Sequence, residues 1–156
     1  MLAQFYRFVV VNNSGSLLTF NAPATGRINL KVTAWFIDPE TGKVTYAQLA
    51  DDDLGFVADS SLADGAEIVG DVEIDNTTNL YIGLQVQLEI THDEGAAADG
   101  TFDVYIAEGD ATGELPTDAS GYDSAELNNL PMIGNLKWHA SGADDEVMRS
   151  AIMPVE

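Results

Sequence analysis

Residues 80–91, LYIGLQVQLEIT, alternate between apolar and mostly polar side chains, and this alternation constrains the fold more than any other feature of the sequence. The apolar positions are Leu80, Ile82, Leu84, Val86, Leu88 and Ile90, and the positions between them are Tyr81, Gly83, Gln85, Gln87, Glu89 and Thr91. Because successive side chains of a β-strand point to opposite faces, the pattern predicts a strand with one apolar and one wetted face. Such a strand belongs to an antiparallel sheet that is covered on one side only.

The same period of two recurs along the chain. It is clear at 28–37, 68–75 and 101–108, and weaker at 4–11, 16–20, 43–49, 132–138 and 146–153. About nine short strands separated by turn-rich gaps are typical of a sandwich or a barrel. We therefore predict a single all-β domain over residues 1–156, folded as a jelly-roll-like antiparallel β-sandwich of about eight or nine strands.

Turn chemistry predicts one hairpin directly. DPETGK, at 38–43, separates the strands predicted at 28–37 and 43–49. Pro39 presets the backbone for a type I turn, and Gly42 can take the left-handed position that closes it.

Three further connections follow from composition. NTTN, at 76–79, is expected to close a second hairpin between 68–75 and 80–91. HDEGAAADG, at 92–100, is expected to join neighbouring antiparallel strands through a mobile tip. DSAELNNLP, at 123–131, predicts a single helical turn.

The net charge of −20 excludes several classes of partner. The chain holds 26 acidic and six basic residues, and from Val44 to Ile133 it has twenty acids and no Lys or Arg. A surface of this sign repels phosphate groups, so we expect neither nucleic acid nor an anionic membrane as a partner. No apolar run reaches the roughly 18 residues of a membrane-spanning helix. No Cys is present for a disulfide or a thiolate metal site.

Carboxylate clusters are the candidates for a metal or catalytic site. Asp51, Asp52 and Asp53 are adjacent, Asp93, Glu94 and Asp99 share one loop, and residues 107–131 hold six acids and no base. Such loops could supply oxygen ligands to Ca²⁺, but the spaced pattern of a calcium loop is absent, and a solvated acidic face is the alternative interpretation. No carboxylate pair stands out for a glycosidase, and His92 and His139 lack the partners of a metal site or triad. We predict no metal, no cofactor and no enzymatic activity.

Apolar residues offer two candidate binding surfaces. Trp35, Tyr81 and Tyr105 are expected on the outward faces of their strands, where aromatic rings stack on sugars, anchor a protein interface or cover a sheet. The two ends of the chain are its least acidic parts. They are expected to be either paired core strands or an apolar docking face turned toward a larger assembly. The residues predicted for this partner interface are Leu2, Phe5, Trp35, Met148 and Met153.

Two longer passages resemble a family of viral structural proteins. They are GRINLKVTAWFIDPETGKVTYAQL, at 26–49, and GTFDVYIAEGDATGELPTDASGYDSAELNNLPMIGNLKW, at 100–138. In style they are similar to the decoration, or cement, proteins of tailed-phage and related viral capsids. The resemblance implies a small jelly-roll-like β protein, often trimeric, that sits on the outside of a head shell.

The resemblance and the charge pattern together lead to one functional expectation. We expect a virion structural protein that binds the major capsid protein lattice as a homotrimer and stabilises the shell. It would be made in the host cytoplasm and reside on the outer capsid surface. The alternatives are a carbohydrate- or calcium-binding β-sandwich module and a phage tail-associated β domain.

The excess of acids makes a testable prediction about stability. Repulsion among the 26 carboxylates destabilises the compact state, and salt screens that repulsion. Raising NaCl from about 10 mM to about 0.5 M is therefore expected to raise the melting temperature in a thermal scan, whereas EDTA is expected to leave it unchanged. A melting temperature that falls with salt, or that EDTA lowers, would contradict this prediction.

Overall fold

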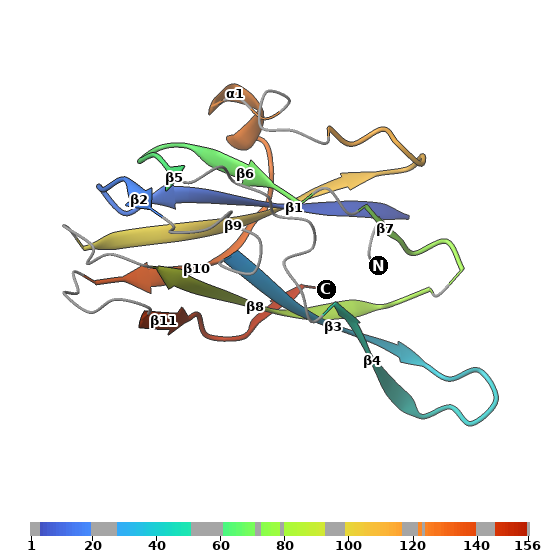
Figure 1. Ribbon diagram of the computed structural model, residues 1–156. Helices are drawn as coiled ribbons and strands as arrows, with labels where there is room; N and C mark the ends of the chain where they lie inside the picture. Colours follow the sequence, from blue (N-terminus) through green and yellow to red (C-terminus); the bar gives the residue numbers. More distant parts are fainter. Residues whose placement is uncertain are drawn as a thin grey trace.

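The computed structural model of the protein describes residues 4–19, 28–50, 61–70, 73–78, 80–92, 99–116, 122, 124–139 and 146–155. These residues form two antiparallel sheets of five strands each, which lie face to face (Figure 1). One small two-stranded sheet and one helical turn complete the described part of the chain. The prediction of an all-β antiparallel sandwich is confirmed.

The first sheet is organised around β1, one of its inner strands. Its order is β10 (Met132–Trp138), β9 (Gly100–Gly109), β1 (Phe5–Asn13) and β6 (Glu67–Val69), and β7 (Ile74–Asp75) pairs with the beginning of β1. β1 pairs with β9 over its whole length, from Phe5 opposite Gly109 to Asn13 opposite Thr101. Strands therefore bind β1 on both of its edges.

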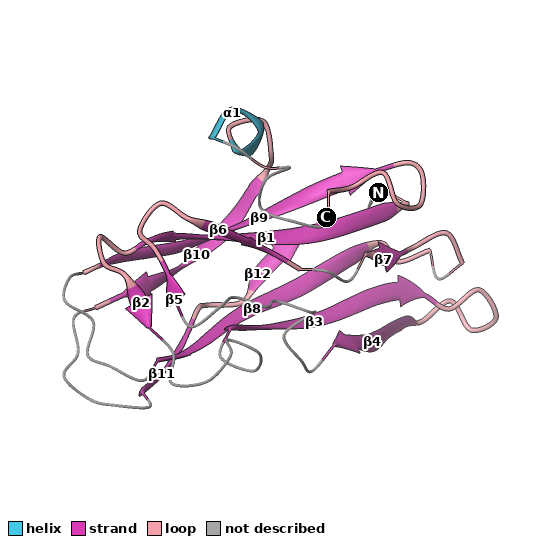
Figure 2. Ribbon diagram, turned by 45° about the horizontal axis from the view of Figure 1, so that its top comes forward, coloured by secondary structure: helices cyan, strands magenta, loops and turns pink. Residues whose placement is uncertain are grey.

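The second sheet has β8 and β3 at its centre. Its order is β11 (Glu146–Arg149), β8 (Gly83–His92), β3 (Ile28–Ile37) and β4 (Val44–Ala50), and β12 (Met153–Val155) also pairs with β8. β2 (Leu18–Thr19) and β5 (Ser61–Leu62) form the small separate sheet. The predicted helical turn is present as α1 (Ser124–Leu127), which lies beyond the first sheet (Figure 2).

The predicted hairpin between β3 and β4 is confirmed, and its turn shows why the chain reverses there. Asp38 Oδ1 accepts hydrogen bonds from the backbone N–H groups of Glu40 and Thr41, at 2.8 and 3.0 Å. These bonds lower the pKa of the Asp38 carboxyl, and the bond from Thr41 has the larger effect. Gly42 adopts φ = 68°, a left-handed conformation that glycine takes without strain.

The predicted hairpin across NTTN is wrong, because β7 and β8 lie in different sheets. The chain passes between the sheets at Asn76, which is buried and holds the backbone of Tyr81: its Oδ1 accepts the Tyr81 N–H (2.6 Å), and its Nδ2 donates to the Tyr81 carbonyl (3.2 Å). Leu80 adopts φ = 52°, which a strand residue does not take. β8 therefore begins at Gly83, and Tyr81 is buried in the core instead of pointing outward as predicted.

The prediction that residues 92–100 join neighbouring strands is also wrong. β8 ends in the second sheet and β9 begins in the first, so the chain crosses the sandwich here. Residues 93–98 lie outside the described part of the chain. A polar, Gly-containing connection serves a hairpin and a crossover equally well, so its composition does not distinguish the two.

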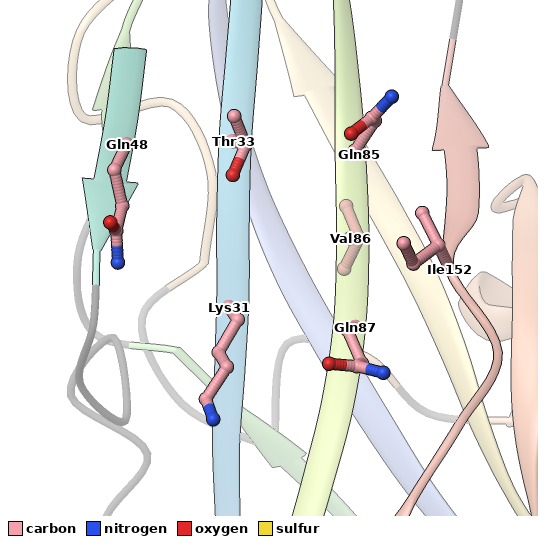
Figure 3. Close-up of a pocket in the computed structure, with 7 residues that line it drawn as sticks. All are labelled: Lys31, Thr33, Gln48, Gln85, Val86, Gln87 and Ile152. Atoms are coloured by element: carbon pink, nitrogen blue, oxygen red, sulfur yellow. The ribbon is translucent and has the colours of Figure 1, made fainter. Parts of the chain in front are cut away.

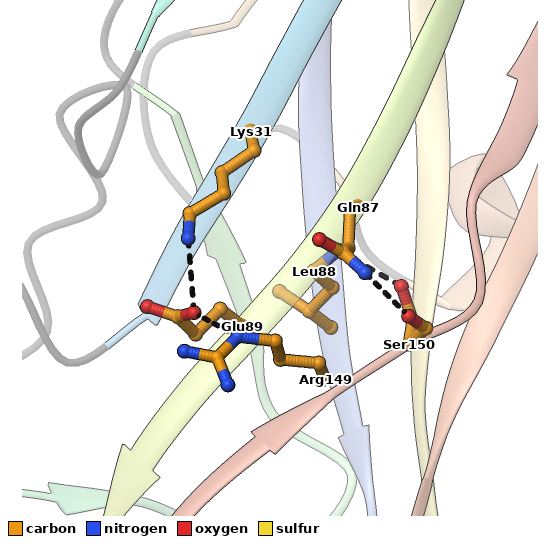
Figure 4. A network of polar contacts seen from close by, with 6 residues as sticks. All are labelled: Lys31, Gln87, Leu88, Glu89, Arg149 and Ser150. Carbon is orange, nitrogen blue, oxygen red and sulfur yellow. Dashed lines mark hydrogen bonds and ion pairs between the residues drawn. The ribbon is translucent and has the colours of Figure 1, made fainter.

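The strand predicted at 146–153 is divided into β11 and β12 by Ser150. This residue is buried and continues the ladder with its side chain: Leu88 donates its N–H to Ser150 Oγ, and Ser150 donates its N–H to the Leu88 carbonyl, both at 2.9 Å (Figure 4). The strand predicted at 68–75 is similarly divided into β6 and β7, both paired with β1.

The main core fills the space between the sheets with the alternating apolar residues that the sequence predicts. β3 and β8 contribute Ile28, Leu30, Val32, Ala34, Leu84, Val86, Leu88 and Ile90, and the first sheet contributes Tyr6, Phe8, Val10, Phe102, Val104, Ile106 and Leu136. All of these side chains are 2% exposed or less. Burial of each large apolar side chain contributes roughly 1.5–3 kcal/mol, so this layer supplies most of the driving force for folding.

A second buried cluster lies on the opposite face of the first sheet, where described residues of the acid-rich segment 107–131 pack against it. It consists of Val9, Val69, Ala107, Leu115 and Tyr122, with Tyr105, Leu127 and Leu130 packed against it. β1 is consequently buried on both faces from Phe5 to Asn12. The segment that we considered as a solvated acidic loop thus covers the sheet with its apolar residues.

Arg7 connects this covering segment to β1. Its side chain is 3% exposed, Nη1 donates to the Gly70 carbonyl (2.6 Å), and Nη2 lies 3.9 Å from Glu73 Oε2. The Glu73 carboxylate in turn accepts the N–H of Gly113 at 2.9 Å. Because a buried guanidinium needs partners, this network fixes where the covering segment meets the sheet.

Tyr6 gives a testable prediction about the core. Its hydroxyl is buried and has no hydrogen-bond partner among the described residues, and burial raises its pKa above the usual value. An unpaired buried polar group costs about 1–3 kcal/mol, so Tyr6→Phe is expected to raise the free energy of unfolding in urea by about 1 kcal/mol. The control is Tyr46→Phe, at a position that is 60% exposed. This variant is expected to change the free energy of unfolding little. A destabilised Tyr6→Phe variant would show that the hydroxyl is paired.

Candidate functional site on the outer face of the second sheet

The outer face of the second sheet carries uncharged polar and aromatic side chains in rows. Strand register places Trp35 opposite both Tyr46 and Gly83. It places Thr33 opposite both Gln48 and Gln85. We call this surface the outer groove, and define it by Lys31, Thr33, Trp35, Tyr46, Gln48, Gln85, Gln87, Ile152 and Pro154.

Two shallow hollows make up the outer groove. The first, of about 240 Å³, is lined by Lys31, Thr33, Gln48, Gln85, Val86, Gln87 and Ile152 (Figure 3). The second, of about 290 Å³, is lined by Trp35, Val44, Tyr46, Leu84, Gln85 and Pro154. Because Gln85 lines both, the hollows adjoin along β8. Figure 3 shows β4, β3 and β8 carrying the lining residues, with Ile152 from the segment before β12 on the other side.

Trp35 lies over the neighbouring strand. A Cβ atom on Gly83 would come within 2.7 Å of Trp35 Cε2 and 2.8 Å of the Val155 carbonyl oxygen. Glycine therefore provides the space that the indole occupies, which is a known reason for glycine within a strand. Tyr46, 60% exposed, stands on the opposite side of Trp35, on β4. The two rings form the aromatic end of the outer groove.

The other end of the outer groove is a compact ion-pair network. Glu89 Oε2 lies 3.1 Å from Lys31 Nζ and also accepts a hydrogen bond from Arg149 Nε (Figure 4). The Glu89 side chain is 12% exposed. Burial raises the pKa of this carboxyl, but the hydrogen bonds and charges of Lys31 and Arg149 outweigh burial, and its pKa lies below the usual value. The three residues come from β3, β8 and β11 and link these strands.

Gln87 is held in place beside this network. Its Nε2 donates to the Ser150 carbonyl at 2.9 Å (Figure 4). The same Ser150 divides β11 from β12, and the chain after it carries Ile152 and Pro154 along the groove. The break in the edge strand therefore builds one wall of the site.

The chemistry of the outer groove favours binding over catalysis. Its ionisable groups are Lys31, which is paired with the Glu89 carboxylate beside Arg149, and the Tyr46 phenol. Within the described ranges, no group of three or more His, Cys, Asp or Glu side chains could hold a metal ion. Stacking and hydrogen bonding are what the groove can offer a ligand.

The five residues predicted for a partner interface lie in three different environments. Phe5, Met148 and Met153 are 5–6% exposed and pack inside the domain. Trp35 is half-buried and belongs to the outer groove. Leu2 lies outside the described residues. β1, β11 and β12 are apolar because they contribute core residues, and among the four described residues of this set Trp35 alone lines the outer groove.

The other candidate residues are dispersed. Asp51–Asp53, Asp93 and Glu94 lie outside the described residues. Asp99 and His139 are exposed at the same end of the paired strands β9 and β10, where Gly100 pairs with Trp138. Tyr105 is half-buried against the second cluster, where burial, then the Asp103 carboxylate, raises its pKa.

Sequence reasoning missed most of the outer groove. The alternation of 80–91 correctly places Gln85 and Gln87 on the outward face, but by itself gives no reason to connect them with another strand. The link is the register of β3 with β4 and β8, which aligns Trp35 with Tyr46 and Thr33 with Gln85. The glycine opposite Trp35 was the available signal, because a glycine within an otherwise regular strand marks a close approach.

Comparison of the chain with family models, with curated proteins and with solved structures gave no match. In the described part of the chain, no helix has the length and apolar character needed to cross a membrane. The function must therefore be inferred from the residues of this chain.

Glu89 makes the site sensitive to acid. Because its pKa is lowered in the folded state, the stability it contributes is present above the pKa of the unfolded chain and is lost as the pH falls through the folded value. In urea denaturation between about pH 5 and pH 3, the wild type is expected to lose stability more steeply than Glu89→Gln. Glu40→Gln, in the exposed turn after β3, is the control and should keep the wild-type pH profile. Identical profiles for wild type and Glu89→Gln would disprove the role of this network.

Proposed function

We propose that this protein is a virion structural protein, a capsid decoration or cement protein that binds the outside of a head shell and stabilises it. The observation that carries the proposal is a separation of charge. On a chain of net charge −20, the β4 strand, VTYAQLA, has no charged residue. Ile37 and Val44, which are paired at the end of the β3–β4 hairpin, are each 53% exposed. The turn beyond them carries Asp38, Glu40 and Lys43, so this apolar patch has a charged border on that side. An apolar centre with a polar rim is typical of protein interfaces.

The edge of β4 supports the same proposal. Among the described strands, β4 pairs with β3 alone, and its register is regular from Val44 to Ala47. Other edges are guarded: β6 has three residues, β12 contains Pro154, and the pairing of β10 shifts between Met132 and Gly134. Short strands, Pro and bulges prevent an edge from pairing with another chain. The pairing of β4 also shifts, between Val32 and Thr33 of its partner strand, but β4 has neither charge, Pro nor a bulge from Val44 to Gln48. A strand of this kind is suited to contact with a partner protein.

The mechanism of stabilisation is thermodynamic. A protein that binds the assembled lattice of the major capsid protein, and not its separated subunits, stabilises the shell by mass action. Assembly as a homotrimer would engage several lattice sites at once and raise the overall affinity without new contacts. The acidic remainder of the surface, turned to solvent, would oppose aggregation of free copies by repulsion.

This function implies where the protein is made and where it resides. It would be made in the host cytoplasm and reside on the outer capsid surface, with no nucleic acid, membrane or cofactor as a partner. A tail-associated β domain would use the same hairpin on a different assembly. The carbohydrate-binding alternative draws on a separate observation, the aromatic and amide lining of the outer groove.

The test is binding to empty head shells of the virus that encodes the chain. Wild-type protein is expected to co-sediment with the shells, to saturate at a fixed number of copies, and to raise the melting temperature of the shells in calorimetry. Unassembled capsid protein should not be retained. Native mass spectrometry of the free protein is expected to show a trimer.

Matched variants locate the contact. Val44→Asp and Ile37→Ser, at the end of the hairpin, are expected to weaken shell binding by about tenfold or more, because truncation of central interface residues has effects of this size. Leu17→Ser, at a position that is 59% exposed and outside the hairpin, should bind as the wild type does. Wild-type protein that leaves the shells bare, or that is found on tails, would refute the assignment.

A further inference from the structure

The structure assigns a second binding activity: we infer that the outer groove binds a neutral oligosaccharide. This inference goes beyond the proposed function and centres on a different part of the second sheet. Shell binding is proposed at the edge of β4 and the end of the hairpin, whereas the outer groove lies on the broad face of the sheet, over β4, β3 and β8. The two surfaces meet at Val44, which lines the second hollow, so the groove is tested with variants of β3 and β8.

The aromatic end of the groove is built for stacking. Trp35 occupies the space left by the absent side chain of Gly83, so its indole is supported from below by the sheet. Tyr46 flanks it, and the two residues are cross-strand partners. The C–H faces of sugar rings pack against such aromatic surfaces, and the geometry here is held by backbone register instead of by a mobile loop.

Beside the rings of Trp35 and Tyr46 lie side chains that can form hydrogen bonds with sugar hydroxyls. Gln48, Gln85 and Gln87 each carry an amide, and Thr33 carries a hydroxyl. Amide and hydroxyl groups both donate and accept hydrogen bonds, as sugar hydroxyls do. Gln85 lines both hollows, and Gln87 is fixed by its bond to Ser150. A ligand whose surface alternates C–H faces with hydroxyls matches this pattern.

The charge of the groove selects a neutral ligand. Lys31 is its cation, and it is paired with Glu89, to which Arg149 also binds. No other described residue of the groove is charged at neutral pH. An anionic sugar would meet the repulsion of a chain with net charge −20, while a cationic one would find better partners elsewhere on the acidic surface.

The dimensions allow more than one sugar unit. Lys31 and Trp35 mark the two ends of the groove on β3, four residues apart, which is a distance of about 13 Å in a strand. The two adjoining hollows, of about 240 and 290 Å³, run along this length. Their shallow form suits a chain that passes along the sheet and is held at several points.

Tryptophan fluorescence provides a direct test. The sequence has two tryptophans, and Trp138 is 2% exposed in the core, so a ligand-induced change in emission reports on Trp35. The probes are cellohexaose, maltohexaose, mannohexaose and hexa-N-acetylchitohexaose, which are neutral, with hexagalacturonate as the anionic comparison. At least one neutral probe is expected to shift the emission in a saturable manner, with a dissociation constant that is the same in about 50 mM and about 0.5 M NaCl. Hexagalacturonate should not bind.

Three variants separate sugar binding from other uses of the face. Trp35→Ala and Gln85→Leu are expected to weaken binding of the neutral probe about tenfold or more. Their affinities are measured by calorimetry, because Trp35→Ala removes the fluorescent reporter. Gly83→Ala is expected to do the same by displacing the indole. Gln85 is exposed, so Gln85→Leu tests the amide without disturbing the core. Leu17→Ser is again the control and should retain full binding.

The outcomes are distinct from those for the capsid assignment. Absence of binding to every neutral probe at millimolar concentration, or binding that survives both Trp35→Ala and Gln85→Leu, would overturn the inference. Loss of shell binding in Gln85→Leu, without any response to sugars, would instead assign the groove to a protein partner. If the protein binds a sugar but does not bind the head shells, the sugar site is supported and the capsid assignment is refuted.

Discussion

The enclosure of β1 is the constraint on which the rest of this structure depends. The strand is paired along both edges and buried on both faces, so it requires a cover on each side. The second sheet supplies one cover through the main core, and the acid-rich segment after β9 supplies the other through Leu115 and Tyr122. Arg7, in the middle of the strand, then needs polar partners within that second layer, and it finds them in Gly70 and Glu73. One inner strand thereby determines a three-layered arrangement.

The fold could largely be predicted from periodicity, because burial imposes a period of two on each strand. The residues predicted at 28–37 form a strand with the same bounds, and its inward positions are core positions. Periodicity does not say which sheet a strand joins, and that is where prediction failed. The turn at Asn76 is set by two side-chain bonds to the backbone of Tyr81, and a polar turn sequence does not reveal whether it closes a hairpin or leads to the opposite sheet.

The site was less accessible to prediction for a related reason. The apolar terminal strands resemble a docking face in sequence, yet Phe5 and Met153 are apolar because they are core residues. Trp35 was placed on the outward face correctly, but its surroundings come from two other strands, and their alignment depends on register that a single sequence does not state. The distribution of charge describes the groove more directly. Lys31 and Arg149 are both paired with Glu89, so the groove is nearly neutral although the chain as a whole is acidic.

The pairing of Phe5 with Gly109 has a consequence for how the chain reaches its native state. Contacts between residues so far apart in sequence carry a large loop-closure cost, and domains dominated by them fold in milliseconds to seconds rather than microseconds. During synthesis, the edge of β1 that pairs with β9 stays unpaired until β9 has been made, although β6 and β7 can already pair with the other edge. Exposed strand edges of this kind drive the association of unfinished chains. The abundant carboxylates between the two strands keep nascent chains apart during that delay. Acidity in this protein thus has a kinetic value that is independent of any partner it meets once folded.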